Sequence, residues 1–167
     1  MGVFVSIFDE IINRLNSENI PSGLLEDIKE IQIGPKKDNQ GVNKYPSLVI
    51  STQPSFITES FEGARRDRKI ADLSINIRIL DKVTASRAIN LYFDTSTQKG
   101  ILYLIEKILD VIHTDSSGNL DPRFASLGKR SAIVEVGELQ LLQDEVLMCD
   151  ISITAQLKDF EINKRRT

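Results

Sequence analysis

Four cations fall within five consecutive positions of this chain: Arg65, Arg66, Arg68 and Lys69, interrupted only by Asp67. A cluster of this kind can bind phosphate groups or an acidic protein surface. Little aromatic interleaving accompanies it, so the pattern does not favour stacking against single-stranded nucleic acid. The whole chain has a net charge of −3, which provides no general basic field. Two interpretations stay open: a solvated loop leading into a strand, or a contact with an acidic partner protein.

The single histidine and the single cysteine have no partners in the sequence that would make them reactive. His113 falls at the end of a predicted helix, where an imidazole interacts well with the helix dipole. The only carboxylate near it is Asp110, and no nucleophile accompanies the pair. Cys149 falls on the apolar face of a predicted strand, which indicates a reduced, buried side chain. One cysteine also excludes an intramolecular disulfide and a multi-cysteine zinc site.

The segment 115–121 places oxygen-bearing side chains at alternate positions, as the first half of a calcium loop does. The sixth position of such a loop should be glycine and is Leu120. The twelfth should be glutamate and is Ser126. Both departures affect residues that shape or close the site, so we interpret the segment as an ordinary polar turn.

Two pairs of carboxylates could be drawn as acid–base catalysts, Glu59 with Glu62 and Glu135 with Glu138. Such a pair needs one shared cleft and separated pKa values. Neither pair belongs to a distinctive motif, and no glycine-rich phosphate-binding loop is present. The sequence therefore predicts no catalytic residue, no metal site and no cofactor, and hence a protein that is not an enzyme.

Two amphipathic helices are predicted. The first should span residues 3–17, where apolar residues follow the i, i+3, i+4 rule at Phe4, Ile7, Phe8, Ile11, Ile12 and Leu15. The second should span residues 97–113, with Thr95 or Ser96 as N-cap. Its apolar face comprises Ile101, Leu104, Ile105, Ile108 and Ile112. A further short helical turn is expected at 24–29.

Strict alternation of apolar and polar residues predicts long strands with one buried face at 147–157 and 69–80. The buried faces should comprise Leu147, Cys149, Ile151, Ile153, Ala155 and Leu157 on one strand, and Leu73, Ile75, Ile77 and Ile79 on the other. Segments 31–33 and 45–52 also read as strands, and 54–63 as a strand or an extended arm. Segments 132–142 and 146–158 should form a hairpin across 143–145.

This order of elements predicts one α+β domain spanning residues 1–167, with a frayed tail at 160–167. We expect an antiparallel sheet of about four to five strands, two main helices packed on one face, and long loops. Apolar residues at Val49, Ile133 and Met148 fall on the second face of the sheet. They indicate a cover of further helices or a neighbouring subunit. No apolar run approaches the ~20 residues that span a bilayer, so no membrane segment is expected.

The layout resembles the tail terminator (tail-completion) proteins of long-tailed bacteriophages. An N-terminal helix is followed by a strand that starts at Tyr45-Pro46-Ser47-Leu48-Val49-Ile50. A charged arm from Glu59 to Lys69 leads into a long alternating strand, and one long helix and a closing hairpin follow. The resemblance covers most of the chain and rests on the order of elements. The family has no invariant motif, so no role is carried over to an individual residue.

The resemblance implies a structural virion protein at the junction of tail and neck, assembled in the host cytoplasm. Subunits of this family form a hexameric ring on the end of the tail tube. The implied partners are further copies of the chain, the tail tube protein and a neck or connector protein, with DNA passing near the ring channel. Arg65, Arg66, Arg68 and Lys69 are the candidate partner contacts.

Two other interpretations stay open. One is a related head–tail joining protein, such as a stopper or adaptor of the neck. The other belongs to a different class: a small-ligand-binding module or an uncharacterised enzyme whose site assembles from scattered residues. Size in solution should separate the classes, because a ring is much larger than one chain.

Overall fold

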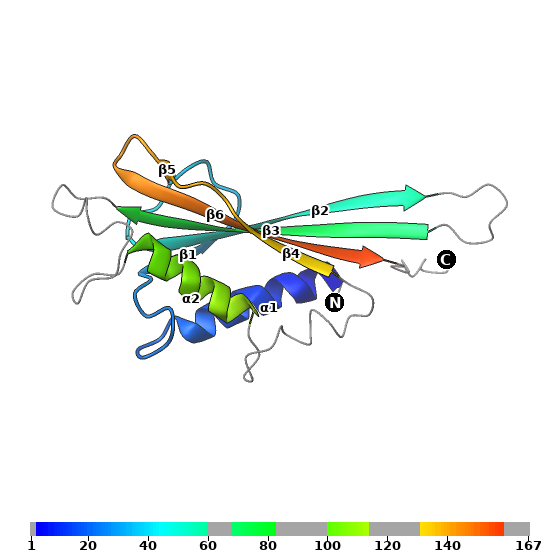
Figure 1. Ribbon diagram of the computed structural model, residues 1–167, viewed down its shortest axis with the longest axis horizontal. Coiled ribbons are helices and arrows are strands. Elements are labelled where there is room, and N and C mark those ends of the chain that lie inside the picture. Colours follow the sequence, from blue (N-terminus) through cyan, green and yellow to red (C-terminus); the bar gives the residue numbers. More distant parts are fainter. Residues whose placement is uncertain (1–2, 60–67, 83–99, 114–130, 159–167) are drawn as a thin grey trace.

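Two helices lie side by side beneath one long, twisted sheet (Figure 1). The computed structural model describes residues 3–59, 68–82, 100–113 and 131–158. The helices are α1 (Val3–Glu18) and α2 (Ile101–His113). The strands are β1 (Glu30–Ile33), β2 (Ser47–Glu59), β3 (Arg68–Lys82), β4 (Ser131–Val136), β5 (Gln140–Leu141) and β6 (Val146–Lys158). The predicted α+β class, with both main helices on one face of the sheet, is therefore confirmed.

The strands form one sheet in the order β1-β2-β3-β6-β4, and β5 pairs separately with β6. Every pairing is antiparallel except that of β1 with β2, so the sheet is mixed and not purely antiparallel as predicted. The parallel pair arises because the chain leaves β1, loops back through residues 34–46 and enters β2 in the same direction. Six strands also exceed the four to five that were expected.

Several predicted boundaries change in the structure. The predicted strands 45–52 and 54–63 are joined in one continuous strand, β2, which begins at Ser47 and is described as far as Glu59. The predicted strand 132–142 is divided after Val136 into β4 and β5, whose pairings with β6 differ in register by one residue: Val136 pairs with Ile151, whereas Gln140 pairs with Met148. The short helical turn expected at 24–29 is a series of turns, in which the Leu25 N–H caps α1 through the Glu18 carbonyl (3.0 Å). The segments 83–99, 114–130 and 159–167 lie outside the described residues. They contain both proposed N-caps, the calcium-like segment and the predicted tail at 160–167.

The main core lies between the helices and one face of the sheet. Its buried apolar side chains come from the predicted stripes of both helices and the alternating faces of β3 and β6: Ile7, Ile11, Leu15, Leu104, Ile108, Ile112, Leu73, Ile75, Ile77, Ile79, Leu147, Cys149, Ile151 and Ile153. Phe8 and Ile12 of the first stripe are partly buried, and the side chains of Phe4, Ala155 and Leu157 lie outside the described set. The expected buried faces are confirmed, since Ile75, Ile77, Ile151 and Ile153 are all buried on the helix side, where Ile75 pairs with Ile153 and Ile77 with Ile151. Burial of this continuous apolar surface is the main source of stability for the fold.

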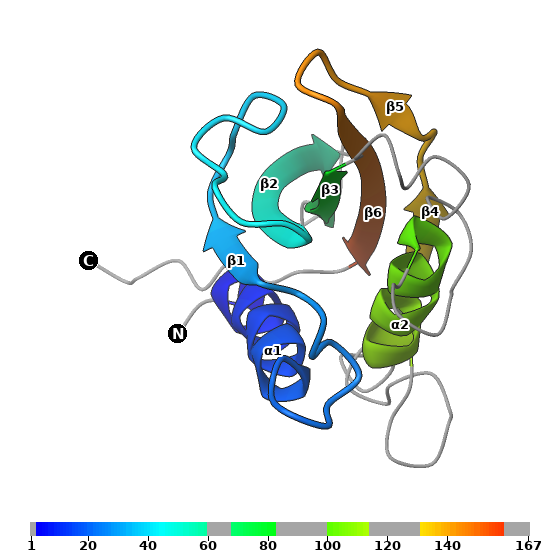
Figure 2. The same cartoon turned by 90° about the vertical axis from the view of Figure 1, so that its left-hand side faces the viewer.

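A second, smaller core lies on the opposite face of the sheet. There Val49, Leu80, Val146 and Met148 are buried together with Val42, and Tyr45 and Leu142 pack against them. The cover is the chain's own β1–β2 loop, residues 34–46, together with the turn after β5 (Figure 2). Neither a further helix nor a neighbour is needed at Val49 and Met148, which corrects the expectation for these residues. The side chain of Ile133 lies outside the described set.

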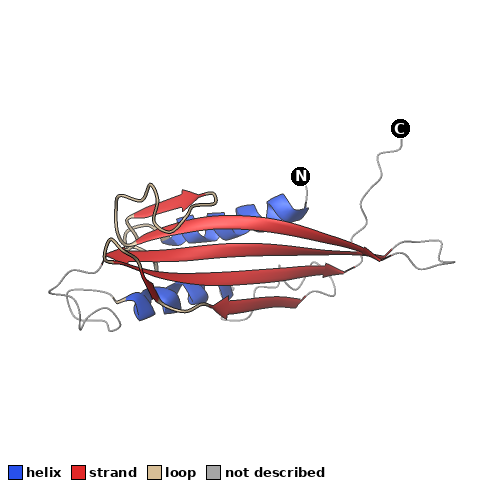
Figure 3. Cartoon of the chain, turned by 90° about the horizontal axis from the view of Figure 1, so that it is seen from above, coloured by secondary structure: helices blue, strands red, loops and turns tan. Residues whose placement is uncertain are grey.

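The β1–β2 loop covers only one end of this face. Figure 3 looks onto the face and shows β2 and β3 continuing away from the loop, with the helices behind the sheet. The sheet therefore has a thick end, with a core on both faces, and a thinner end formed by the far halves of the long strands.

Candidate assembly surfaces

The structure divides the predicted cation cluster between two settings. Arg68 and Lys69 belong to the start of β3, where the register places them opposite Glu59 and Thr58 of β2. Arg65 and Arg66 lie outside the described residues. Arg68 is therefore part of a strand ladder and not of the loop that was expected to precede the strand.

These residues lie at the end of a projecting hairpin. The last residue of β6, Lys158, pairs with Ile70, so the final rungs of β2 and β3 pair only with each other within the described chain. Figure 1 shows both strands running past the N-terminal end of α1 and past β4. The hairpin thus carries Arg68 and Lys69, the last two residues of the cation cluster, to an extremity of the described structure.

The other candidate residues stay apart from one another. His113 is the last residue of α2, and nearby Asp110 is exposed. Cys149 is a free cysteine that is 1% exposed in the main core, as predicted. Burial raises the pKa of its thiol, and Asp150 adds to the effect. Glu135 and Glu138 are both exposed. The side chains of Glu59 and Glu62 are not described.

Among the described strands, the sheet has a free edge on each side. β1 covers β2 only as far as the pair Ile33–Ile50, and no other described strand pairs with β2 on that side. On the opposite side of the sheet, β4 is the outermost strand of the described chain. Free edges expose unpaired main-chain donors and acceptors, which can pair with another chain.

One row of side chains joins the two edges on the helix-facing side of the sheet. Pairings across the strands align Ile33, Ile50, Ile77, Ile151 and Val136. The three central residues are fully buried, whereas Ile33 is 57% and Val136 is 47% exposed. The apolar row thus ends in an exposed apolar side chain at each edge. An exposed valine or isoleucine next to a free edge is a feature of strand-pairing surfaces.

An ion pair that sequence analysis did not single out holds the β1–β2 loop on the sheet. Arg78 of β3 and Asp150 of β6 face each other across the ladder, with Nε–Oδ1 2.8 Å and Nη2–Oδ2 3.0 Å. The remaining nitrogen, Nη1, donates to the carbonyl oxygens of Lys36 (3.0 Å) and Asp38 (3.2 Å). The hydrogen bond to Asp150 raises the pKa of Arg78. The sequence did contain a signal for this ion pair, because Arg78 and Asp150 have opposite charges and fall on the polar faces of the two predicted strands.

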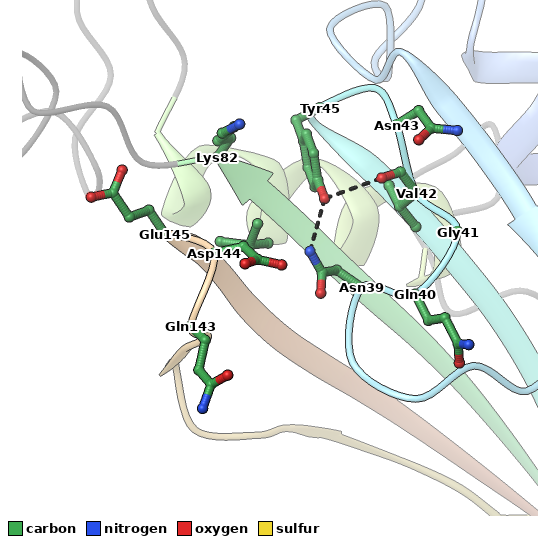
Figure 4. A pocket seen from close by; sticks show the side chains of 11 residues that line it. Asn39, Gln40, Gly41, Val42, Asn43, Tyr45, Lys82, Gln143, Asp144 and Glu145 are labelled. Atoms are coloured by element: carbon green, nitrogen blue, oxygen red, sulfur yellow. Dashed lines mark hydrogen bonds between the residues drawn. The ribbon is translucent and has the colours of Figure 1, made fainter.

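Beside this loop lies an open, polar hollow of about 800 Å3. Figure 4 shows the loop side chains on one flank and the β5–β6 turn on the other. Tyr45 organises the loop flank, since its hydroxyl donates to the Val42 carbonyl (3.3 Å) and accepts a hydrogen bond from Asn39 Nδ2 (3.0 Å). Lys82, Asp144 and Glu145 supply charges of both signs. The hollow is wide and shallow, unlike the enclosed, mostly apolar clefts that bind small molecules.

No model of a known protein family matches this sequence, and no curated protein matches it either. No described helix has the length and apolar character needed to cross a lipid bilayer. Within the described ranges, no three histidine, cysteine or acidic side chains come together as a metal site.

Proposed function

We propose that this chain is a structural ring subunit of the tail terminator type, which closes the end of a phage tail tube and joins it to the neck. The observation that carries the proposal is the sheet with two free edges on opposite sides, each next to an exposed apolar residue, Ile33 or Val136. Cyclic rings are built from heterologous contacts, in which one surface of a subunit meets a different surface of its neighbour. Two different free edges meet that requirement.

The β2–β3 hairpin suits a contact with a second component. It projects past the helices, and its described end carries Arg68 and Lys69, the last two residues of the cation cluster. A tube or neck protein with an acidic surface would match this charge. Charges at the rim of an interface mainly set orientation and association rate. A virion location at the tail–neck junction belongs to the same proposal.

Electron microscopy of the purified protein, alone and with tail tubes, tests the proposal. We expect closed rings, hexameric by the resemblance, that sit on tube ends. Rings that bind a neck component but never a tube would support a stopper or adaptor instead. A protein that stays monomeric with all partners present would contradict ring formation.

The hairpin contact needs its own variant. Arg65→Glu with Arg66→Glu reverses charge without touching the described ladder, and should block tube docking while leaving circular dichroism native-like. Arg68→Glu is a poorer probe, because it would place two acids opposite each other at Glu59 and destabilise the hairpin itself. Lys107→Glu, on α2 and away from the hairpin, is a matched control that should leave docking unchanged. Normal capping by the Arg65/Arg66 variant would contradict the contact.

A second candidate function, a small-ligand-binding module, would use the polar hollow, although its wide, shallow shape favours this function less than the first. Its amides and mixed charges could bind a polar ligand. Under that function the protein would be monomeric and would be stabilised by a ligand, whereas rings without ligand-dependent stabilisation favour the first proposal.

A further inference from the structure

The two lateral edges of the sheet's thick end lie at the same height, measured along the strands. One edge is β1, from Glu30 to Ile33, and the other is the chain from Val136 to Gln140. Two rows of paired residues connect these limits: Glu30, Ser47, Leu80, Met148 and Gln140 in one, and Ile33, Ile50, Ile77, Ile151 and Val136 in the other. Rotation about an axis along the strands changes no height. It would bring the β4–β5 edge of one copy level with β1 of the next.

Both edges expose apolar side chains on the helix-facing side of the sheet. Ile33 is 57% exposed at the β1 edge, and Val136 and Leu141 are 47% and 67% exposed at the opposite edge. Val136 pairs with Ile151 and Leu141 with Leu147, and both partners are buried in the main core. A patch of apolar residues within a polar or charged rim is the usual composition of a protein interface.

The rim of the β4–β5 edge is acidic. Residues 134–146 contain Glu135, Glu138, Asp144 and Glu145 and no lysine, arginine or histidine, which gives a formal charge of −4. All four acids are exposed, and within the described ranges none of them forms an ion pair. This edge therefore favours a partner surface that carries cations.

The β1–β2 loop carries the opposite charge. Residues 34–46 contain Lys36, Lys37 and Lys44 against a single acid, Asp38. Lys37 and Lys44 are exposed. Figure 2 shows the loop and β5 on opposite sides of the sheet, so one copy presents its cations on one flank and its acids on the other.

The acids close to β1 do not cancel these lysines. Glu26 accepts a hydrogen bond from a main-chain N–H of its own turn (2.9 Å), and Glu30 accepts one from Gln32 (2.6 Å). Asp27 is offset by the exposed Lys29 two residues later. The lysines of the loop are thus the charges that this flank offers to a neighbour.

We propose that the acidic β4–β5 edge of one copy packs beside β1 and the β1–β2 loop of the next copy. Val136 and Leu141 cover the exposed Ile33 on the helix side. Glu135 lies on the opposite face of β4, the face that the loop also covers, and meets the lysines there. In this arrangement β5 of one copy lies outside β1 of the next, so no strand is displaced.

The two surfaces of this contact differ, so the contact is heterologous and can repeat around a ring. The inference rests on the proposed ring, and it identifies the surfaces that build it.

Charge reversal tests the contact. A loop variant, Lys37→Glu with Lys44→Glu, makes the loop acidic, and an edge variant, Glu135→Lys with Glu138→Lys, places cations on both sides of Val136. Neither variant should form rings, because like charges then meet. A chain that carries all four substitutions has these charges exchanged, and should form rings again. Circular dichroism checks that each variant is folded, and electron microscopy counts the rings.

Asp9→Lys with Glu106→Lys is the matched control. Both positions are exposed, on α1 and α2, and the pair changes the net charge as much as the edge variant does, so rings should persist. Rings from a folded loop or edge variant would overturn the contact and leave the ring itself intact. A folded fourfold variant without rings would do the same. An unmodified protein that stays monomeric would overturn both the contact and the proposed function.

Chemical crosslinking provides a second measurement that leaves the charges unchanged. Ile33→Cys and Val136→Cys are prepared separately in a Cys149→Ala background, mixed, and treated with a short thiol-specific crosslinker. We expect a covalent dimer in the mixture and none in either sample alone, because the two residues belong to different surfaces. Leu102→Cys, exposed on α2, replaces Ile33→Cys as the control and should give no dimer. Rings without the mixed dimer, or a dimer in either sample alone, would overturn the contact.

Discussion

Arg78 and Asp150 form a bidentate ion pair across the β3–β6 ladder, on the face of the sheet opposite the helices. The same guanidinium binds two carbonyls of the β1–β2 loop, at Lys36 and Asp38. One side chain thus ties three separate segments together. Because both charged groups are less than one-third exposed, solvent screens them less than it would a surface pair.

Removing the guanidinium should free the loop without unfolding the sheet. We expect Arg78→Met to cost about 1–3 kcal/mol, because it breaks charge-assisted hydrogen bonds and leaves the Asp150 carboxylate without its partner. Limited proteolysis should find new cleavage sites within 35–41. Glu10→Gln is the control, because it weakens the i, i+4 pair with Arg14 on α1, worth about 0.3–0.5 kcal/mol, and does not touch the β1–β2 loop anchor. Equal losses in both variants would contradict an anchoring role.

Ile153 lies in the centre of the main core at 1% exposure, with Ile75 beside it on β3. Ile153→Asp should abolish folding, because it buries a charge with no partner. Ile153→Ala should remain folded and lose about 2–5 kcal/mol of unfolding free energy. Chemical denaturation measures the loss in Ile153→Ala, and the solubility of the expressed protein reports whether Ile153→Asp folds.

Thr154→Asp is the matched control for this pair of variants, because the neighbouring side chain points to the opposite face and is partly exposed. It should cost no more than about 1 kcal/mol, the span of strand propensities. If Thr154→Asp unfolds the protein and Ile153→Asp does not, the faces of β6 are assigned the wrong way round.

The outcome at Ile153 follows from period-two alternation, which is why the sequence could predict it. Side-chain spacing along one strand or helix is a local property, so the buried faces of β3, β6, α1 and α2 were predictable. The direction of β1 was not predictable, because its parallel pairing with β2 depends on the path of the loop 34–46 between the two strands. The sequence also did not reveal that the pairing with β6 shifts by one residue between Val136 and Gln140, which divides the predicted strand.

The candidate surfaces were less predictable than the fold. Arg78 and Asp150 are 72 residues apart in sequence, and only the β3–β6 register brings them together. The free edges depend on strand order, which the composition of a single strand does not encode. The cation cluster was visible as a run of charges, but its division between β3 and the preceding segment required the register of the hairpin.

Cys149 should resist thiol reagents in the native protein. The side chain is buried, and burial raises the pKa of the thiol, so the reactive thiolate is scarce as well as shielded. Because its pKa is raised, the native thiol stays protonated to higher pH than the thiol of the unfolded chain. Alkaline pH above the unfolded pKa near 9.0 therefore favours unfolding.

Alkylation of Cys149 followed by mass spectrometry should show slow labelling that accelerates in denaturant. Labelling at the rate of a free thiol under native conditions would contradict this burial.

Glu30 should make the attachment of the β1–β2 loop sensitive to acid. Its Oε1 accepts a hydrogen bond from Gln32 Nε2 (2.6 Å), and the same nitrogen also donates to the Gly41 carbonyl (3.0 Å). The hydrogen bond from Gln32 lowers the pKa of Glu30 below 4.5, and the main-chain N–H groups of Asn43 and Lys44 contribute. The carboxylate thus connects β1 to the second half of the loop, residues 41–44.

A lowered pKa means that the folded state favours the ionised form. The stabilisation is fully present above the unfolded value of 4.5 and is lost as pH falls through the lower folded value. Glu30→Gln removes the charge at every pH, so its unfolding free energy should be lower than that of the native protein near neutral pH. The difference should shrink on acidification, since the native protein then loses the same contribution. Glu26→Gln provides the comparison at an exposed acid outside this network. Parallel stability curves for the native protein and Glu30→Gln across the acid range would show that the carboxylate does not hold the loop.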